Sequence, residues 1–438
     1  MLSEKCRRLL SDDHGGGTIM GLFWFMLLVG ITGLAVDTTD GLRNKTMLQA
    51  TADASALAGA IKLPVASAAV ATAISYSDSN MPVEEYGDVL QPGDVEVGTW
   101  DTSTHSFSAG GLLPDAVRVQ LHQTVENANA VPVNFLRIVG LTTWDVNVEA
   151  VAQRFIPKCL KDGLVARGIV DISSNNSFGN EICIHGQQGV EMQNNNYYES
   201  GVNVSMPNVD DQLTIPTGGM ESNPGLPEAL RENRLDPRMV NHIDEIMAQM
   251  LDPSSAIIPS YIDKSKPVIT VDDKFDLSTA QPGRIYYVDC KANKTASIPS
   301  NTVTTRVVII ADCEVSIGSG ALLVDVVIGS RSGGNKKTEN ANIGLAANVV
   351  LGLPDSCAPG GGVQLFSNAS IHTASSTQIN GVQMVAKGDV DLGAANSGIN
   401  GISVQSGGNI TMTSNNQFGL CSDGAPNLFT VDYYRLVR

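Results

Sequence analysis

Histidine and aspartate side chains with a spacing suited to acid–base chemistry lie in three similar units of about 20 residues within residues 361–420. Aligning the units places three polar residues in one outward file, Ser370, Asp389 and Asn409, and three in the next, His372, Asp391 and Thr411. Strands of neighbouring units would stand about 4.8 Å apart, so His372 and Asp391 can pair. Polysaccharide lyases and hydrolases occur among proteins with stacked strands and a groove, and a His–Asp pair can supply acid–base groups there.

A solvated surface is the simpler interpretation of the same residues. Asp389 and Asp391 point outward from a strand whose Val390 and Leu392 point inward. Glycoside hydrolysis requires two carboxylates at a defined separation across a groove, and the sequence alone does not reveal such a groove. The asparagine-rich turns suit glycan contact, but asparagine also tolerates left-handed turns and stacks in ladders at strand corners.

Sequence motifs of catalysis and cofactor binding do not occur. The chain contains no G-x-S-x-G elbow, no P-loop, no HExxH and no EF-hand loop. Its cysteines lack CxxC spacing and its six histidines are scattered, which argues against a metal site. We therefore predict no catalytic, cofactor-binding or metal-ligating residues, no cofactor, and a protein that is not an enzyme.

Cysteine usage predicts an oxidising environment for most of the chain. Cys6 precedes the apolar stretch described below, and an even set of six follows it: Cys159, Cys183, Cys290, Cys313, Cys357 and Cys421. An even exported set is typical of three disulfides. Fifteen pairings are possible, and the simplest joins neighbours along the chain.

The three units also predict the fold that carries these residues. Each holds two short strands, and the inward pairs are Val363/Leu365 and Ile371/Thr373, Val382/Met384 and Val390/Leu392, and Ile402/Val404 and Ile410/Met412. One unit cannot bury its apolar face alone, whereas stacked units bury a continuous column, as in a right-handed parallel β-helix. Related fragments suggest that the stack starts near Gly163, is interrupted, and resumes near Arg306.

Residues 18–36 form an uncharged apolar stretch that rises about 28 Å as a helix, close to the hydrocarbon thickness of a bilayer. A secretory signal peptide is the alternative, but the stretch exceeds a signal h-region and lacks a small-residue cleavage site. Lys5, Arg7 and Arg8 lie on its N-terminal side. We expect a single-pass membrane protein with a cytoplasmic N-terminus and with periplasmic or cell-surface domains after the span.

The helix is expected to continue outward to about Leu63, and a second helix covers 66–77. Ala50, Ala54 and Ala58 recur every fourth residue and form a small-residue face on which another helix can pack closely. Beyond Val95 three segments alternate with period two and predict a small antiparallel sheet, with a helix at VPVNFLRIVG.

The net charge of the chain limits its possible partners. With 45 acidic and 28 basic residues the net charge is −17, which argues against binding nucleic acid or an anionic lipid surface.

We expect a cytoplasmic N-terminus at 1–17, the transmembrane helix at 18–36, an α+β domain at 37–155, first rungs at 156–206, a proline-rich insertion with a helix at 207–300, and further rungs at 301–438. The fold class is thus α+β followed by all-β.

A family resemblance covers residues 10–155. The stretch DDHGGGTIMGLFWFMLLVGITGLAVDTTDGLRNKTMLQATADASALAGA, followed by VEVGTWD, AVRVQL, VPVNFLRIVGL and VEAVAQ, resembles the N-terminal region of the TadG-like proteins of Flp (Tad) pilus assembly. The resemblance implies a pilin-like α+β domain in an inner-membrane protein of the pilus machinery. Its partners would be other pilus components or pilin-like subunits.

Two features depart from that family. Cleaved pilins carry glutamate five residues after the cleaved glycine, whereas Leu22 follows Gly17 at this position, so we expect the N-terminus to be retained. Relatives often carry a von Willebrand A domain with a D-x-S-x-S motif. The nearest match here begins at Asp171 and ends in Asn175, without the strand–helix alternation of that domain.

The sequence predicts a non-enzymatic, membrane-anchored component of pilus assembly, with an exported β-helical surface that contacts partners. A carbohydrate-binding adhesion module that contacts surface glycans is the alternative, and a polysaccharide lyase or hydrolase is a further one.

Overall fold

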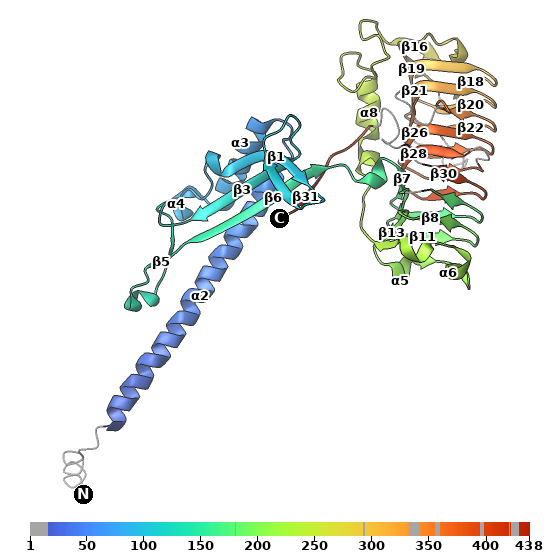
Figure 1. Cartoon of the computed structure of the whole chain (residues 1–438). Coiled ribbons are helices and arrows are strands. Elements are labelled where there is room, and N and C mark those ends of the chain that lie inside the picture. Colours follow the sequence, from blue (N-terminus) through green and yellow to red (C-terminus); the bar gives the residue numbers. More distant parts are fainter. Residues whose placement is uncertain are drawn as a thin grey trace, which may run out of the picture. The chain divides into compact units, whose positions relative to one another are not determined.

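The computed structural model describes residues 16–438 except 180, 292–293, 333–341, 355–359, 395–397, 420 and 422–428. The chain forms two compact units (Figure 1). Unit 1 comprises residues up to Phe155 together with Asp432–Arg438, and unit 2 comprises Ile156–Val431. Unit 2 is therefore inserted between two segments of unit 1.

Unit 1 is built on the helix α2, Gly16–Ala60, which contains the apolar stretch and ends near the predicted boundary. Among the described residues this is the one helix long and apolar enough to cross a membrane. The second helix, α3 (Ala66–Asn80), packs closely on α2, because a Cβ atom at Gly59 would lie 3.1 Å from the Ala69 carbonyl oxygen. The short helices α4 (Val83–Tyr86) and η1 (Pro92–Asp94) follow.

The sheet of unit 1 is antiparallel, in the order β2 (Ser106–Ala109), β1 (Val95–Asp101), β3 (Ala116–Gln123), β6 (Val146–Phe155) and β31 (Tyr433–Leu436). Leu48, Ala52 and Ala56 of α2 are fully buried in one cluster with Val117 and Val119 of the sheet. The three predicted strands are present. The predicted helix at VPVNFLRIVG is wrong: this stretch contains β4 (Val131–Pro132) and the single 3₁₀ turn η2 (Leu136–Val139), and the segment continues to β5 (Thr143–Trp144).

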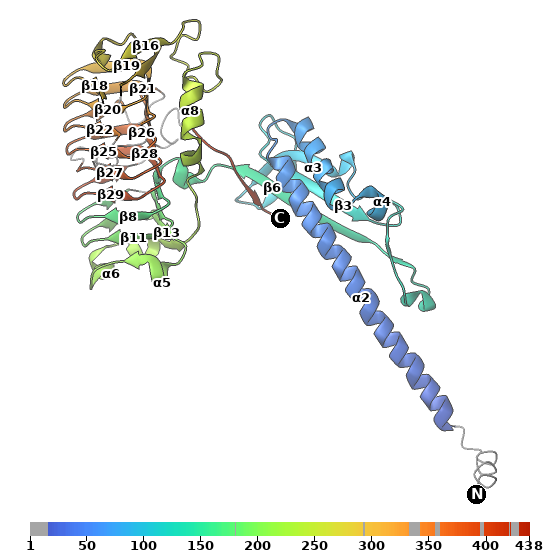
Figure 2. The ribbon, with the colours of Figure 1, turned by 180° about the vertical axis from the view of Figure 1, so that it is seen from behind.

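Unit 2 consists of two parallel sheets, and each repeat adds strands to both (Figure 2). The larger has the order β15 (Leu230–Glu232), β13 (Asn203–Met206), β10 (Cys183–Gly186), β7 (Gly163–Ala166), β28 (Ile399–Ser406), β26 (Gln378–Ala386), β23 (Val350–Leu351), β21 (Leu322–Ser330), β19 (Val303–Ala311), β17 (Arg284–Asp289) and β16 (Ile269–Asp272). Beside this path lie β24 (Val363–Ser367), β9 (Ser177–Phe178), β12 (Tyr197–Tyr198) and β30 (Gln417–Gly419).

The smaller sheet has the order β14 (Leu213–Thr214), β11 (Gly189–Met192), β8 (Ile169–Ile172), β29 (Ile410–Met412), β27 (Val390–Leu392), β25 (Ile371–Thr373), β22 (Ile343–Leu345), β20 (Glu314–Ile317) and β18 (Thr295–Ile298). Short helices complete unit 2: η3 (Lys158–Leu160), α5 (Val209–Gln212), α6 (Gly219–Ser222), α7 (Leu226–Ala229), η4 (Arg238–His242), α8 (Ile243–Met250) and η5 (Leu277–Thr279).

The apolar pattern of the repeats sets the register. Val382 pairs with Ile402 and Val390 with Ile410, both in parallel strands, as the repeat alignment predicts. The predicted inward side chains are buried in one cluster between the sheets, apart from Thr373, which is buried but polar. The larger sheet is also covered on its outer face, where Ile310, Val327 and Phe366 contact α8 and its neighbours. Burial on both faces explains its continuous Val/Ile runs.

The spatial order of the strands differs from their order in the chain. The chain enters unit 2 at β7, adds strands towards β15, crosses the outer face of the larger sheet through η4 and α8, and returns from β16. The returning chain ends against its starting point, because Val404 of β28 pairs with Leu164 of β7. The predicted insertion at 207–300 therefore needs correction, because β14 and β15 in its first part and β16 to β18 in its last part belong to the two sheets.

Disulfides join neighbours along the chain. Cys159 bonds Cys183, and Cys290 bonds Cys313, as in the simplest predicted pairing. Cys421 is also disulfide-bonded. Cys357 and Cys6 lie outside the described residues.

Candidate functional site

The most specific polar contact of unit 1 is made by Asp37, one residue beyond the predicted membrane span. Its side chain is 3% exposed. Its carboxylate accepts hydrogen bonds from the backbone N–H groups of Asn134, Phe135 and Leu136, at 3.0, 2.9 and 2.7 Å. A buried carboxylate requires such donors, and these three successive amides lead into η2, whose N-cap residue is Phe135. Asp37 therefore fixes the segment 131–144, here named the finger, to the helix.

Two glycines flank Asp37 on the same helix face, one turn before and one turn after it. A Cβ atom at Gly33 would lie 2.6 Å from the Phe135 Cβ, and one at Gly41 would lie 2.5 Å from the Trp144 ring. Larger residues at these positions would displace the finger. The spacing Gly-x₃-Asp-x₃-Gly thus forms a notch that receives the finger at three successive turns of α2.

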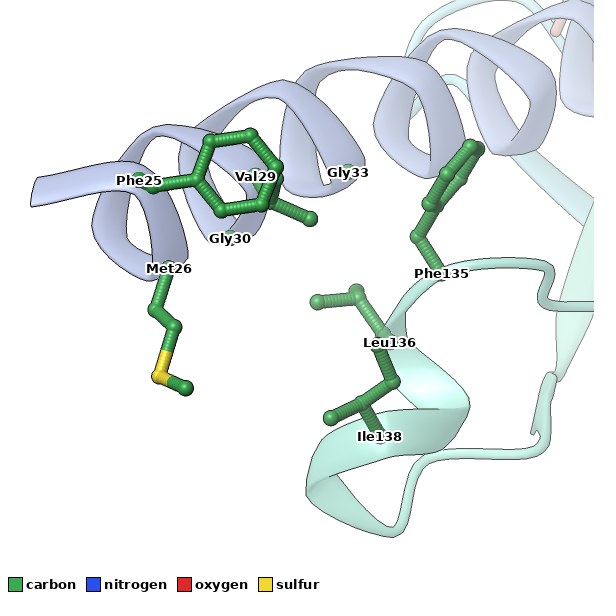
Figure 3. A pocket seen from close by; sticks show the side chains of 8 residues that line it. All are labelled: Phe25, Met26, Val29, Gly30, Gly33, Phe135, Leu136 and Ile138. Carbon is green, nitrogen blue, oxygen red and sulfur yellow. The ribbon is translucent and has the colours of Figure 1, made fainter. Parts of the chain in front are cut away.

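A cavity of about 410 Å³ lies between α2 and the tip of the finger (Figure 3). Its eight lining residues are apolar or glycine: Phe25, Met26, Val29, Gly30 and Gly33 from α2, and Phe135, Leu136 and Ile138 from the finger. Figure 3 shows the Leu136 and Ile138 side chains extending from the finger on the side of α2 that carries Phe25 and Met26. The cavity can bind apolar groups, and its lining offers no side chain for acid–base or metal chemistry.

The predicted helix-packing residues differ in accessibility. Ala50 is exposed and Ala54 is half-buried, whereas Ala58 is 5% exposed. The neighbouring Gly59 already accommodates α3 of the same unit. Ala58 is therefore not available to a second subunit, and the predicted face is free only at its membrane-proximal end.

The predicted pair His372 and Asp391 lies on the exposed face of the smaller sheet. The two residues are partners in the register, with 3.7 Å between His372 Nδ1 and Asp391 Oδ2. Their side chains are 53% and 46% exposed, so this is a solvated surface contact. The described residues contain no group of three or more His, Cys, Asp or Glu that could hold a metal ion.

Asp171 follows Asp391 and Thr411 in the same outward file of the smaller sheet. Burial raises the pKa of Asp171 above its ordinary value. Its strand, β8, is flanked by parallel strands and is followed by β9 rather than a helix. This region therefore does not form a von Willebrand A domain.

The asparagine-rich turns have a structural role. The side-chain oxygen of Asn176 accepts from the backbone N–H of Asn416, that of Asn196 from Asn176, and that of Asn223 from Asn196. All four residues are buried. They form a ladder along one corner of the stack, which satisfies backbone amides that would otherwise be unpaired.

A similar outward ladder contains the other aligned residues. Asp389 accepts from the N–H of Asn409, and Asn409 accepts from the N–H of Ile169. Ser370 accepts from the N–H of Asp389 at 3.2 Å. The polar residues that the repeat alignment brings together thus serve the stack itself.

The fold and the site define a class of protein with one long apolar helix, a small α+β unit and a large parallel-sheet unit. Residues 163–422 match the model of a family described as a domain of unknown function, DUF7867, and the chain belongs to this family. Residues 36–152 match a second family, described as putative Tad-like Flp pilus-assembly. Comparisons with curated proteins and with solved structures found no match.

The second match begins at Val36 and ends within β6, so it contains Asp37 and the whole finger. The role of Asp37 was not among the predictions from the sequence. The spacing of Gly33, Asp37 and Gly41 was the available signal.

Proposed function

We propose that the protein is a membrane-anchored, non-enzymatic component of Flp pilus assembly, with an N-terminus in the cytoplasm and with unit 2 and the part of unit 1 that follows the span on the other side of the inner membrane. The observation that carries the proposal is the match of residues 36–152 to the putative Tad-like pilus-assembly family, which lies in unit 1. The apolar stretch of α2, which is 6% buried, supports the anchor.

In this proposal α2 holds the sheet of unit 1 at a fixed distance from the membrane. The helix is continuous over 45 residues, so the span and the core of unit 1 form one element. A helix that leaves a membrane and packs on an antiparallel sheet has the layout of a pilin. Pilin-like subunits and other pilus components are the proposed partners, and Ala50 lies on the part of α2 that stays exposed for them.

Unit 2 supplies the proposed contact surface. Its parallel stack of repeats fits a right-handed β-helix, in which side chains of successive rungs form long files. The file on the smaller sheet contains His372, Asp391, Thr411 and Asp171, and it provides a polar surface for a protein partner or a surface glycan. No step of catalysis is assigned to this surface.

Gene deletion with designed complementation tests the proposal. Because β31 follows unit 2 and pairs with β6, truncation after Phe155 would also remove a strand of unit 1. Residues 156–432 should instead be replaced by a two-residue Asn-Gly turn, which directly joins paired residues of antiparallel strands. Phe155 and Tyr433 are register partners, so the two ends can be connected.

We expect the deletion strain to lack pili, and the variant without unit 2 to restore assembly but not attachment. Normal pili and attachment in the deletion strain would refute the proposal. Depolymerisation of a polysaccharide by the purified protein, lost in His372→Ala and Asp391→Ala, would identify an enzyme instead.

A further inference from the structure

We propose that the finger enters the bilayer beside α2 and that Phe135 and Ile138 contact lipid acyl chains, so that unit 1 meets the membrane twice. The inference rests on the proposed membrane anchoring. It assigns the apolar cavity a partner of defined chemistry, the hydrocarbon of the leaflet on the C-terminal side of the span.

The contacts between the finger and α2 determine how deep the finger would lie in the bilayer. Gly33 touches Phe135, and Phe25 lines the same cavity as Ile138. At 1.5 Å per residue, Gly33 lies about 5 Å and Phe25 about 16 Å inside the end of the apolar stretch at Val36. If α2 spans the bilayer, the tip of the finger is therefore at the level of the hydrocarbon and not of the headgroups.

The exposed surface of the finger fits that environment. Phe135, Ile138 and Leu141 are 45%, 83% and 49% exposed. Three large apolar side chains on one short segment are unfavourable in water, whereas acyl chains cover them at no cost. Four of the five α2 residues that line the cavity, Phe25, Met26, Val29 and Gly30, are exposed, so lipid that surrounds the helix is continuous with the cavity.

A non-helical segment in hydrocarbon requires partners for its polar groups, and seven backbone amides of the finger have them within the protein. Asp37 accepts from three of its amides. Within the finger, Ile138 N–H donates to Phe135, Gly140 N–H to Arg137, and Leu141 N–H to Leu136. The Val133 N–H donates to the Thr142 carbonyl at 3.0 Å.

Arg137 is the one charged residue within the sequence of the finger, and it is exposed. Its side chain is long enough to keep the guanidinium at a lipid phosphate while its methylenes remain in the apolar region. A single arginine at this level is compatible with insertion, whereas an acidic residue there would oppose it.

Site-directed spin labelling of the full chain tests the inference. The Cys6→Ser chain, reconstituted in vesicles of phosphatidylethanolamine and phosphatidylglycerol, receives one cysteine at a time for a nitroxide label. The three variants are Ile138→Cys in the finger, Phe23→Cys in the apolar stretch, and Leu112→Cys in a fully exposed loop of the same unit. Collisions with oxygen, which partitions into lipid, are compared with those of a water-soluble nickel chelate.

We expect the label at 138 to match that at 23, with oxygen accessibility severalfold above nickel accessibility, and the label at 112 to show the reverse. A lipid-exposed label at 23 with a water-exposed label at 138 would overturn the inference and leave the anchor intact. A water-exposed label at 23 would refute the anchor itself. Low accessibility of the label at 138 to both reagents would indicate contact with protein, such as a second copy, and would also overturn the inference.

The role of Asp37 provides a second readout. Asp37→Asn removes the charge that holds three amides, so the label at 138 should become more accessible to the nickel chelate and less accessible to oxygen. Asp40→Asn on the same helix should leave both accessibilities unchanged. Equal profiles for both variants would show that Asp37 does not hold the finger in the membrane.

Discussion

The two units use buried polar groups in opposite ways. In unit 1 a single buried carboxylate, Asp37, fixes one distant segment through hydrogen bonds from three successive backbone amides. In unit 2 the ladder from Asn416 to Asn223 repeats one contact rung after rung. Polar contacts that repeat along the stack indicate a structural role. A contact that does not repeat and that lies beside an apolar cavity indicates a functional role. The smaller unit is therefore the better place to look for function.

Val390→Asp should give the largest effect, and it separates the two units most sharply. Val390 is fully buried between Ile371 and Ile410, so the variant places an unpaired carboxylate in the interior at a cost of several kcal/mol. Denaturation followed by limited proteolysis should show unit 2 unfolded and unit 1 intact. The neighbouring outward change Asp391→Asn serves as the control and should alter stability by less than about 0.5 kcal/mol.

Asn176→Ala tests whether the ladder is structural. The variant leaves the Asn416 amide without its acceptor, which should cost about 1–3 kcal/mol of the free energy of unfolding. Thr411→Ala, on the outer face, is the control. If both variants unfold at the same denaturant concentration, the ladder does not stabilise unit 2.

Gly33→Ala tests the notch in unit 1, with Gly30→Ala as a matched control. A Cβ atom at Gly33 meets Phe135 at 2.6 Å, whereas one at Gly30 has nothing within 4 Å. We expect a cost of about 1–2 kcal/mol for the docked finger, seen as roughly tenfold faster hydrogen exchange of the amides that bind Asp37. Unchanged exchange in Gly33→Ala would show that the notch tolerates a larger residue.

Asp162 of unit 2 offers a contrast with Asp37, because its Oδ1 atom is buried without a hydrogen-bond partner. Burial raises the pKa of Asp162 to about 6. The folded state therefore holds the proton more tightly than the unfolded state, and unit 2 should lose stability as the pH rises from about 4 to 6. Asp162→Asn should remove this loss, with a gain of about 1 kcal/mol at pH 7 after allowance for partial solvent screening. A pH-independent difference between the two proteins, measured by urea denaturation, would contradict this prediction.

Sequence patterns predicted what local periodicity determines. The register of Val382 with Ile402 follows from a repeat of about 20 residues, and the pairing of Cys159 with Cys183 follows from neighbouring turns. Long-range closure had no such signal. The pairing of β28 with β7 joins segments 240 residues apart, for example Ser403 with Gly163, and apolar alternation does not specify which rungs meet.

Errors in unit 1 have a similar physical origin. VPVNFLRIVG has the apolar content of a helix, but Asp37 caps it from a distant helix, and only one 3₁₀ turn forms. The alanine spacing correctly indicated close helix packing, but it did not reveal that α3 of the same chain occupies the region around Gly59. Tertiary partners decide both cases, and a single sequence does not name them.

The position of β31 has a consequence for biosynthesis. Because β31 follows unit 2 in the chain, the β6 edge of unit 1 stays unpaired while residues 156–431 are translated, which takes roughly 15 to 50 s at about 5–20 residues per second. An unpaired strand edge invites pairing with other chains. Prematurely terminated chains would carry this edge permanently, so a chaperone or protease that recognises open strand edges would distinguish them from finished molecules.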